Sequence, residues 1–302
     1  MQRVLVTGAK GFIGRYAARE YAKTCYVIGI GHGHWEKNEY KDWGLSEWHE
    51  ADVTMESLQD YVQQIDTIIH CAGSGSVGFS IENPMVDFER TVWTTHYILE
   101  YIRLYSPKTK LIYLSSAAVY GNAQNMPIGE NTPLKPISPY GVHKKIVEEL
   151  CHMYNRTYGV EILIARLFSV YGDGLCKQLL WDACKKLSQG KNLFWGTGKE
   201  SRDFVHVTDV AKALVMMNSK VMKDLQIVNV ASGKAVPINE LLSKLFNAYG
   251  VIDKPCFGGQ INQGNPVHYW ADVKNINSWG WYPEKNLSDG IAEYVRWFKQ
   301  NA

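Results

Sequence analysis

The chain has 302 residues, 46% of them hydrophobic and 21% charged, so it can bury one large core or two closely associated ones. Its net charge is +2 without a long basic run, which gives no support to nucleic-acid binding. The six cysteines show no metal-ligand spacing, and neither a signal peptide nor a membrane-spanning stretch is evident. We therefore expect a reduced, metal-free protein located in the cytoplasm.

The first half of the chain alternates between short β-branched segments and longer amphipathic ones. The expected strands are Arg3–Thr7, Tyr26–Ile30, Thr67–His70, Lys110–Ser115 and Glu161–Arg166. The expected helices are Phe12–Lys23, Met55–Gln64, Pro84–Tyr105 and Pro139–Tyr158. This alternation predicts right-handed βαβ units, and thus an α/β fold with a Rossmann-type, doubly wound parallel sheet.

After Arg166 the alternation loosens into short apolar runs and glycine-rich turns. Helices are expected again at Val210–Ser219, Ile238–Tyr249 and Leu287–Phe298. We predict a dinucleotide-binding domain over 1–166, to which 203–233 return, and a smaller, mostly C-terminal α+β substrate-binding domain over 167–302.

A glycine-rich segment follows the first strand and opens the first helix. Gly8 permits a tight turn, Gly11 lets the backbone approach a pyrophosphate, and Gly14 lets the helix pack closely on the sheet. The N–H groups at the helix start, from Phe12 and Ile13, would hold the phosphate charge. A glycine-rich turn without a ligand is the alternative, but the position after strand one favours cofactor binding.

The end of the second strand bears on the choice of coenzyme. An acid there would hold the ribose hydroxyls of NAD(H) and repel a 2′-phosphate, but the residue is Gly31, with His32 and His34 following. After Gly31, the first acidic residue in the chain is Glu36. We therefore predict NADP(H) as the preferred cofactor, with NAD(H) as the alternative and His32 and His34 among its contacts.

Asp52 and Val53 precede the third expected helix, where a loop would pass the adenine ring. The Asp52 carboxylate could accept a hydrogen bond from the adenine amino group, or it could cap the following helix. These two roles do not exclude each other.

Three residues form the candidate catalytic set. Tyr140 and Lys144 are four residues apart, so they share one face of the helix that Pro139 opens. A neighbouring ammonium lowers the pKa of a phenol, which makes the pair a proton-transfer device. Ser116 ends a parallel strand at the ligand edge of the sheet, where its hydroxyl could hold a substrate oxygen.

Together these motifs resemble the extended short-chain dehydrogenase/reductase family whose members modify nucleotide sugars. The resemblance covers nearly the whole chain. Besides the glycine motif it is carried by His70–Gly73, Leu114–Gly121, Tyr140 with Lys144, Arg166–Gly172, Arg202–Ala211, Pro266 and Ala271-Asp272.

The resemblance implies roles for further residues. Tyr140 would exchange a proton with a sugar hydroxyl or ketone, while Lys144 would hold the nicotinamide ribose and lower the Tyr140 pKa. The implied cofactor contacts also include Cys71, Ala72 and Gly73. The implied contacts to a nucleotide-diphosphate sugar are Val77, Ser80, Ser116, Ser169 and Arg202. A homodimer through Pro84–Tyr105 and Pro139–Tyr158 is also expected.

Several positions depart from the family pattern. Ala117 and Ala118 stand where the family's 4,6-dehydratases carry the Asp-Glu pair that performs elimination, so we exclude that reaction. Thr91 and Ser169 stand where asparagine is common, and Asn262 where arginine commonly approaches the diphosphate. These changes make the usual UDP-hexose contacts uncertain.

Three functions fit these observations. The main expectation is an NADP(H)-dependent reductase acting on a nucleotide-linked 4-keto sugar. The first alternative is a nucleotide-sugar C4 epimerase that retains NAD(P), and the second is a non-catalytic dinucleotide-binding regulator or subunit. Fold alone does not decide among them.

Overall fold

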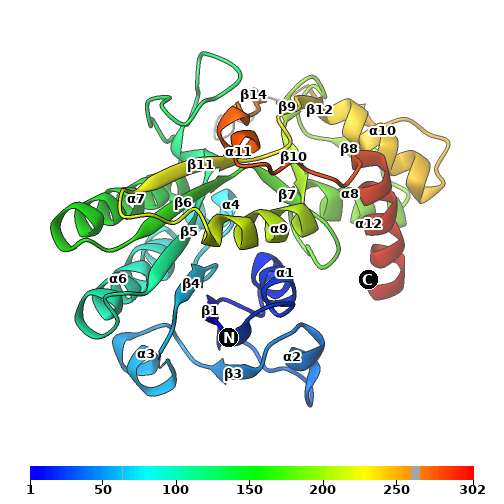
Figure 1. Cartoon of the computed structure of the whole chain (residues 1–302). Helices are drawn as coiled ribbons and strands as arrows, with labels where there is room; N and C mark the ends of the chain where they lie inside the picture. The colour runs from blue at the N-terminus through cyan, green and yellow to red at the C-terminus, as the bar shows by residue number, and fades with distance from the viewer. Residues whose placement is uncertain (63, 260–265) are drawn as a thin grey trace. The chain divides into compact units, whose positions relative to one another are not determined.

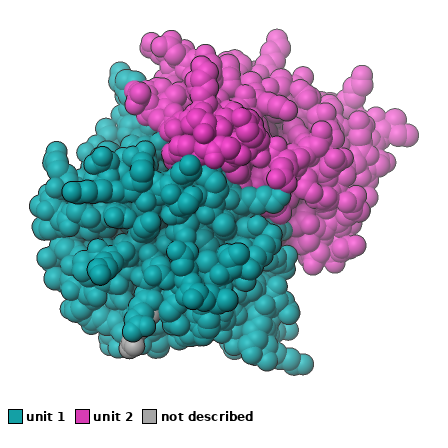
Figure 2. Space-filling view, in the orientation of Figure 1, with its two compact units in different colours: residues 1–121, 133–167, 210–228 teal, residues 122–132, 168–209, 229–302 magenta. Residues whose placement is uncertain are grey.

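The computed structural model describes residues 1–62, 64–259 and 266–302, so the predicted departure at Asn262 lies outside the described residues (Figure 1). The chain divides into two compact units (Figure 2). Unit 1 comprises residues 1–121, 133–167 and 210–228, and unit 2 comprises residues 122–132, 168–209 and 229–302. Residues 122–132 belong to unit 2 although the segments before and after them belong to unit 1. The alternation of predicted strands and helices did not indicate this.

A seven-stranded sheet in the order β11-β6-β5-β4-β1-β2-β3 forms the centre of the first unit, and its pairings from β6 to β3 are parallel. Its strands are β1 (Arg3–Thr7), β2 (Tyr26–Gly31), β3 (Glu47–Glu50), β4 (Thr67–His70), β5 (Lys110–Ser116), β6 (Ile162–Leu167) and β11 (Gln226–Val230). The expected α/β fold with a doubly wound parallel sheet is confirmed.

The sheet forms because its strands are nearly continuous apolar runs that helices cover on both faces. Val4, Leu5 and Val6 are fully buried, and so are Ile68 and Ile69 on the neighbouring strand. From β1, the strands β2 and β3 follow toward one edge of the sheet, whereas β4, β5 and β6 follow toward the other, so the strand order reverses between β1 and β4. The carboxyl ends of these two strands therefore mark the place where such sheets bind ligands.

The helices of unit 1 mostly follow the sequence pattern. They are α1 (Phe12–Tyr21), α2 (Glu39–Asp42), α3 (Met55–Tyr61), α4 (Val77–Glu82), α5 (Pro84–Phe88), α6 (Thr94–Tyr105), α7 (Pro139–Tyr158) and α9 (Val207–Asn218). The expected helix over 84–105 contains a π-helical turn, η1 (Glu89–Trp93), between α5 and α6, and the backbone stays helical at Phe88 and Thr94. Such turns are rare and occur often at functional sites.

Strands β3 and β11 and helices α2 and α4 escaped the sequence analysis, and β3 and α4 show why. Strand β3 reads Glu-Trp-His-Glu, which is too polar for a strand signal, and it is an edge strand paired only with β2 among the described residues. Helix α4 has six residues and begins at the N-cap Ser76, whose hydroxyl accepts a hydrogen bond from the Phe79 backbone N–H.

Unit 2 is built from short strands and four helices among its described residues. The helices are α8 (Gln178–Ser188), α10 (Ile238–Tyr249), α11 (Lys274–Ser278) and α12 (Leu287–Asn301). The strands are β7 (Ser169–Tyr171), β8 (Leu193–Phe194), β9 (Ser201–Arg202), β10 (Phe204–His206), β12 (Val236–Pro237), β13 (Cys256–Phe257) and β14 (His268–Tyr269).

A buried carboxylate organises these short strands. Asp203 has no solvent exposure, and it accepts hydrogen bonds from the backbone N–H groups of Ser232, Gly233 and Ala271. The Ser232 hydroxyl adds a further donor at 2.6 Å. Asp203 thus ties two other chain segments, at 232–233 and at 271, to its own position among the short strands of this unit. Within the described residues no helix is long and apolar enough to cross a bilayer.

Candidate active site

The glycine-rich turn lies against the segment that follows β4. Gly8 has a φ of +64°, and a Cβ placed there would come within 2.8 Å of the Ala72 backbone nitrogen. Only glycine therefore permits both this backbone conformation and the close approach. The fold thus brings together Gly8 and Ala72, two predicted cofactor residues that are far apart in the chain.

The start of α1 has the shape of a phosphate cradle. A Cβ on Gly14 would lie 2.2 Å from the Gly8 carbonyl oxygen, so glycine is required for the helix to begin this close to the turn. The N-cap is Gly11, which has no side chain to satisfy the helix's first N–H groups. The N–H groups of the first turn, which includes Phe12 and Ile13, suit a pyrophosphate, so these residues fit a dinucleotide.

A buried hydrogen-bond relay fastens this turn to the neighbouring strand. The Ala72 N–H donates to Thr7 Oγ1 at 3.2 Å, and Thr7 Oγ1 lies 2.7 Å from His70 Nδ1. On the other side of the ring, His70 Nε2 lies 2.9 Å from Thr95 Oγ1, which donates to the Thr91 carbonyl at 2.7 Å.

The direction of every proton in this relay follows from its two ends. Burial lowers the pKa of His70 to about 3, so the ring is neutral and carries one hydrogen. Because Thr95 donates to a carbonyl, it accepts from His70 Nε2–H, which leaves Nδ1 as the acceptor for the Thr7 hydroxyl. The relay therefore fixes one tautomer and holds Thr7 and Ala72 in place.

The edge of the sheet beside β2 carries more acid than the sequence argument considered. Gly31 pairs in register with Glu50 of β3. His34 Nδ1 lies 3.4 Å from the Glu50 carboxylate, and His32 Nε2 lies 2.8 Å from that of Asp52. The acids missing from the end of β2 are thus present on and just after β3, which the sequence analysis did not recognise as a strand.

One of the two roles considered for Asp52 is excluded. The N-cap of α3 is Thr54, whose hydroxyl accepts from the Ser57 N–H, while the Ser57 side chain bonds back to the Thr54 N–H. This capping box leaves the Asp52 carboxylate paired with His32, beside the exposed predicted cofactor loop. Val53 is buried at the same bend.

The three predicted catalytic residues come together at the end of β5 and the start of α7. Ser116 ends β5, and its hydroxyl is hydrogen-bonded to that of Tyr140. Lys144 Nζ donates to the Leu114 carbonyl at 2.8 Å and lies 5.9 Å from the centre of the Tyr140 ring. Ser138 caps the helix and Pro139 occupies its first turn, which presents Tyr140 at the helix start.

The electrostatics differ from the expectation in one respect. We expected Lys144 to lower the pKa of Tyr140, but burial and the charge of Asp87 raise it, outweighing the hydrogen bond from Ser116. Burial also lowers the pKa of Lys144 itself to about 8, against the opposing effect of Asp87 and weaker acids. Both side chains therefore favour their neutral forms more than they would in water.

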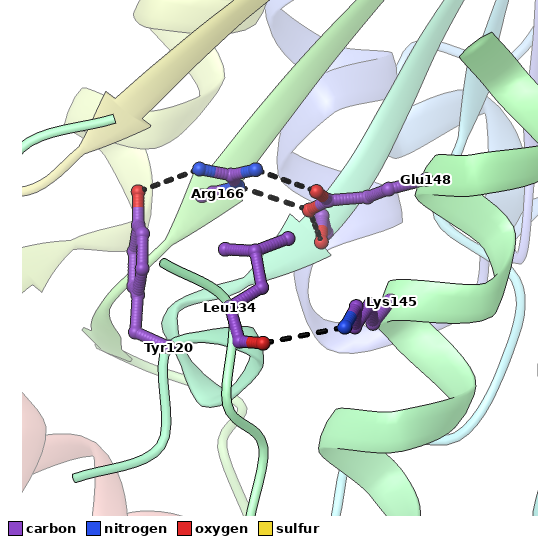
Figure 3. A network of polar contacts seen from close by, with 6 residues as sticks. Tyr120, Leu134, Lys145, Glu148 and Arg166 are labelled. Atoms are coloured by element: carbon purple, nitrogen blue, oxygen red, sulfur yellow. Dashed lines mark hydrogen bonds and ion pairs between the residues drawn. The ribbon is translucent and has the colours of Figure 1, made fainter. Parts of the chain in front are cut away.

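A buried ion pair clamps the middle of the catalytic helix to the sheet (Figure 3). Glu148 on α7 binds Arg166 on β6 through two hydrogen bonds, at 3.0 Å and 2.6 Å. Ser115 donates to the same carboxylate at 2.5 Å, and Arg166 donates to the Tyr120 hydroxyl at 2.9 Å. Because Glu148 and Arg166 are almost fully buried, this clamp sets the position of α7 on β5 and β6.

Short helix α4 supports the first turn of α7. Val77 begins α4, and the Ser80 hydroxyl donates to the Val77 carbonyl at 2.7 Å. The same Ser80 hydroxyl accepts from the Tyr140 backbone N–H at 3.0 Å, and Ser80 is fully buried. Ser80, predicted as a substrate contact, is thus placed where it holds the backbone of Tyr140, the predicted catalytic tyrosine.

The remaining predicted residues divide between the units. Cys71 and Gly73 flank Ala72 after β4, and burial raises the pKa of the Cys71 thiol to about 12. In unit 2, Ser169 begins β7 and its N–H donates to the Asp203 carbonyl at 2.9 Å. Arg202 ends β9 and donates to the carbonyls of Ser201 and Val267.

Sequence reasoning missed a second acid beside the catalytic helix. Asp87 on α5 is fully buried, and its Oδ2 lies 2.6 Å from Nδ1 of His143 on α7. His143 lies between Tyr140 and Lys144 in the chain. Asp87 is followed by Glu89 and Arg90, so its sequence did not distinguish it from an exposed acid.

Comparisons with known proteins agree with this geometry. The family model described as the NAD dependent epimerase/dehydratase family matches residues 4–231. A protein of Methanocaldococcus jannaschii named "Putative UDP-glucose 4-epimerase" is 33% identical over 311 residues, covering 99% of both chains. The UDP-glucuronate 4-epimerase of Thermodesulfobacterium geofontis is 28% identical, covering 98% of this chain and 96% of its own.

Solved structures give the same result. The crystal structure of UDP-glucuronic acid 4-epimerase from Bacillus cereus, in complex with UDP-glucuronic acid and NAD, superposes with a TM-score of 0.88. The two sequences are 26% identical, and the superposition covers 100% of each chain.

Proposed function

Since the chain belongs to the NAD-dependent epimerase/dehydratase family, we propose that it is a nucleotide-sugar 4-epimerase that works with bound NAD. The observation that carries this proposal is the convergence of Ser116, Tyr140 and Lys144 beside a glycine cradle that suits a dinucleotide. The names of the similar proteins support epimerisation rather than the net reduction that we first expected, and the reductase hypothesis gives way to it.

The positions after Ser116 support an epimerase over a dehydratase. Ala117 and Ala118 begin the short 3-10 helix η2 (Ala117–Val119), and the Ala118 N–H donates to the Ser116 hydroxyl at 3.2 Å. Elimination needs a general acid and base close to the reacting carbons, and methyl groups cannot transfer protons.

Each catalytic side chain has a distinct task. Ser116 would hold the oxygen on the sugar's C4, and Tyr140 would take the hydroxyl proton as C4 is oxidised and return it when the ketone is reduced. Lys144 would hold the ribose and favour the phenolate. NAD, when bound, supplies the hydride acceptor. Once the keto sugar has presented its opposite face, the same cofactor supplies the hydride donor. No net oxidant or reductant is consumed.

The raised pKa of Tyr140 fits one half of this cycle directly. In its neutral form the phenol is ready to donate a proton to the ketone oxygen. Removing a proton from the alcohol requires positive charge near the phenol, and Lys144 carries one below pH 8.

The carboxylates at the β3 edge support NAD as the cofactor. Glu50 and Asp52 lie beside His34 and His32, where a negative charge would disfavour a 2′-phosphate. This arrangement supports NAD(H) over the NADP(H) preference that we inferred from Gly31 alone. The proposal therefore assigns coenzyme selection to β3 and the loop after it.

The test combines cofactor identification with turnover. The purified protein is denatured and the released dinucleotide identified by mass spectrometry, and the native protein is incubated with UDP-glucose, UDP-N-acetylglucosamine and UDP-glucuronic acid. We expect NAD, and the appearance of the C4 epimer of one sugar by proton NMR without added cofactor. Consumption of NADPH by a 4-keto sugar nucleotide, with no epimer formed, would restore the reductase hypothesis.

We also propose a homodimer. Helices α5, α6 and α7 and the turn η1 carry large apolar side chains that are exposed, namely Met85, Trp93, Leu104, Tyr105, Val142 and Tyr158. A second copy of the chain could cover them. Light scattering coupled to gel filtration tests the idea, and a monomer at micromolar concentration contradicts it.

A further inference from the structure

One lysine joins the segment after β2 to the glycine-rich turn. Lys10 lies within that turn, and its ammonium donates a hydrogen bond to the carbonyl of His34, 24 residues later in the chain. A Cβ placed on Gly33 would lie 3.1 Å from Lys10 Cδ, so the lysine side chain lies against the backbone at that point. Residues 32–34 are all exposed, and we call them the 32–34 loop.

A buried tryptophan anchors the end of this loop. Trp35 is 3% exposed, and Lys10 Nζ lies 5.2 Å from the centre of its ring. The Arg15 guanidinium on α1 lies 6.0 Å from the same ring, which packs edge-on against Trp48 of β3 with centroids 5.9 Å apart. The Trp35 indole N–H has no hydrogen-bond partner among the described residues, so packing and cation–π contacts hold this side chain.

The other recorded contacts of the loop are to acids at the β3 edge. His32 Nε2 lies 2.8 Å from the Asp52 carboxylate, and His34 Nδ1 lies 3.4 Å from that of Glu50. All four side chains are exposed to solvent, where ion pairs contribute little to stability. Lys10 differs from these acids because it attaches the loop to the glycine-rich turn and not to β3.

The 32–34 loop begins beside the predicted cofactor cradle. The Gly8 N–H donates to the Ile30 carbonyl at 2.7 Å, and a Cβ on Gly31 would lie 3.2 Å from Gly8 Cα. In folds of this type the pyrophosphate lies at the start of the first helix, and the adenosine ribose lies at the end of the second strand. The loop therefore flanks the adenosine half of a bound dinucleotide, and Lys10 connects it to the turn that would hold the pyrophosphate.

A lysine at this place could instead bind the 2′-phosphate of NADP(H), but its surroundings do not favour that role. Its ammonium is already bonded to the His34 carbonyl, and Glu50 lies beside His34. A cavity of about 820 Å³ next to Lys10 has no excess of positive charge. The charged residues that line this cavity are Lys10, Lys37, Lys41, Glu36, Glu39 and Asp42.

An epimerase needs its cofactor to stay bound through a full cycle. The hydride that leaves the sugar must return to the same keto sugar, so release of NADH between the two transfers would leave that sugar oxidised. Contacts that slow the release of the adenosine half therefore serve the reaction although they do not touch the reacting atoms.

We propose that Lys10 and Trp35 are positioning residues for the cofactor, which hold the 32–34 loop against the glycine-rich turn and thereby slow the release of the dinucleotide. The need for slow release rests on the proposed function, whereas the contacts themselves do not. Both residues act through the loop, because neither is among those predicted to touch the substrate or the reacting atoms.

The test is the rate at which NADH leaves the protein. Protein loaded with NADH is mixed with a large excess of NAD, and the loss of bound-NADH fluorescence is followed by stopped flow. Lys10→Met keeps the length of the side chain but removes the charge and the donor. NADH should leave this variant about 5- to 10-fold faster, with the association rate little changed. The urea midpoint of the dinucleotide-free protein should stay close to that of the wild type.

Further variants separate the loop contact from charge in general. Lys41→Met removes an exposed lysine of α2 that lines the same cavity, and it should release NADH at the wild-type rate. Lys10→Arg keeps a cation and a donor and should restore most of the slow release. Trp35→Leu should also speed release, and combining it with Lys10→Met should add little, because both residues hold one loop.

The outcomes distinguish this inference from the proposed function. An unchanged NADH release rate in Lys10→Met would overturn the inference, and so would a loss of affinity confined to NADPH, which would assign Lys10 to a 2′-phosphate. Effects of Lys10→Met and Trp35→Leu that simply multiply would overturn their joint action. Faster NADH release in Lys10→Met by a protein that epimerises no sugar nucleotide would support the role of the loop and overturn the proposed function.

Discussion

Two buried carboxylates pack against the catalytic helix, and they are satisfied to different degrees. Glu148 receives two hydrogen bonds from Arg166 and one from Ser115. Asp87 receives one hydrogen bond, from His143, and its other oxygen has no partner among the described residues. The fully paired acid lies at the middle of α7, and the half-paired acid bonds to His143, four residues after Pro139 begins the helix.

This difference concerns how completely the surrounding donors compensate each negative charge. A carboxylate whose oxygens are saturated by a guanidinium has little field left to act on its surroundings, and its role is to join α7 to the sheet. A carboxylate that keeps one oxygen free in a low-dielectric interior acts on neighbouring ionisable groups instead. Burial alone would not have distinguished Glu148 from Asp87, since both are nearly inaccessible.

The largest expected effect is at the first turn itself. Tyr140→Phe removes the transferable proton while keeping the ring, so kcat should fall by about 10²- to 10⁴-fold. The free energy of unfolding should change little, because the Tyr140 backbone bond to Ser80 remains. Steady-state turnover and urea unfolding measure the two quantities. Near-normal turnover of Tyr140→Phe would show that Tyr140 does not transfer the proton. The contrast between the start of α7 and its middle would then not hold.

The middle of the helix should respond in the opposite way. Glu148→Gln leaves Arg166 buried without its counter-charge, so the free energy of unfolding should fall by about 3–5 kcal/mol. Urea unfolding measures the loss. The paired replacement Glu148→Leu with Arg166→Leu removes both charges and should cost much less. Equal losses in the single and double variants would contradict the ion-pair explanation.

His70 is a third buried group, and both of its ring nitrogens have hydrogen-bond partners. It tests whether such fully bonded interior groups affect stability rather than catalysis. The pKa of His70 is about 3 in the folded protein and near 6.5 when unfolded, so folding stability is lost as the pH falls below 6.5. Between pH 7 and pH 5 this residue should account for about 2 kcal/mol of that loss. His70→Asn should reduce the acid sensitivity measured by urea unfolding. An unchanged pH dependence would mean that another group dominates.

The smallest effect should come from the cap of the catalytic helix. The Ser138 hydroxyl accepts from the Gly141 N–H at 3.2 Å, and Ser138→Ala should destabilise the protein by about 1 kcal/mol. Because Tyr140 lies within this capped turn, turnover should fall modestly with KM little changed. Parallel unfolding and kinetic measurements check this, with Ser219→Ala, at an exposed serine in unit 1, as the control. A loss of stability equal to that of Glu148→Gln would contradict the expected difference between the start of α7 and its middle.

Much of the fold, and the grouping of the candidate catalytic residues, was predictable because short-range patterns encode them. The strand before Gly8 and the four-residue spacing of Tyr140 and Lys144 carry local signals, and the structure brings these residues to the places expected of them. Strand β3 was missed because an edge strand needs no apolar face, and the coenzyme argument at Gly31 was incomplete for that reason.

Other features depend on contacts that a linear pattern does not reveal. The π-helical turn η1 lies in a segment whose backbone stays helical at both junctions, so the helical pattern of 84–105 did not indicate it. The pKa of Tyr140 followed burial rather than its charged neighbour, and burial depends on the whole fold. The pairing of Asp87 with His143, 56 residues later in the chain, is likewise a product of packing.

The relay through Thr7, His70 and Thr95 has a consequence for how this sequence can change over evolutionary time. Each hydroxyl in it both gives and receives a hydrogen bond, so the orientation of one group dictates that of the next. A single substitution leaves its neighbour with a proton and no acceptor, or with a lone pair and no donor. These three positions, separated by 63 and 25 residues, should therefore be replaced together through compensating substitutions, and not one at a time.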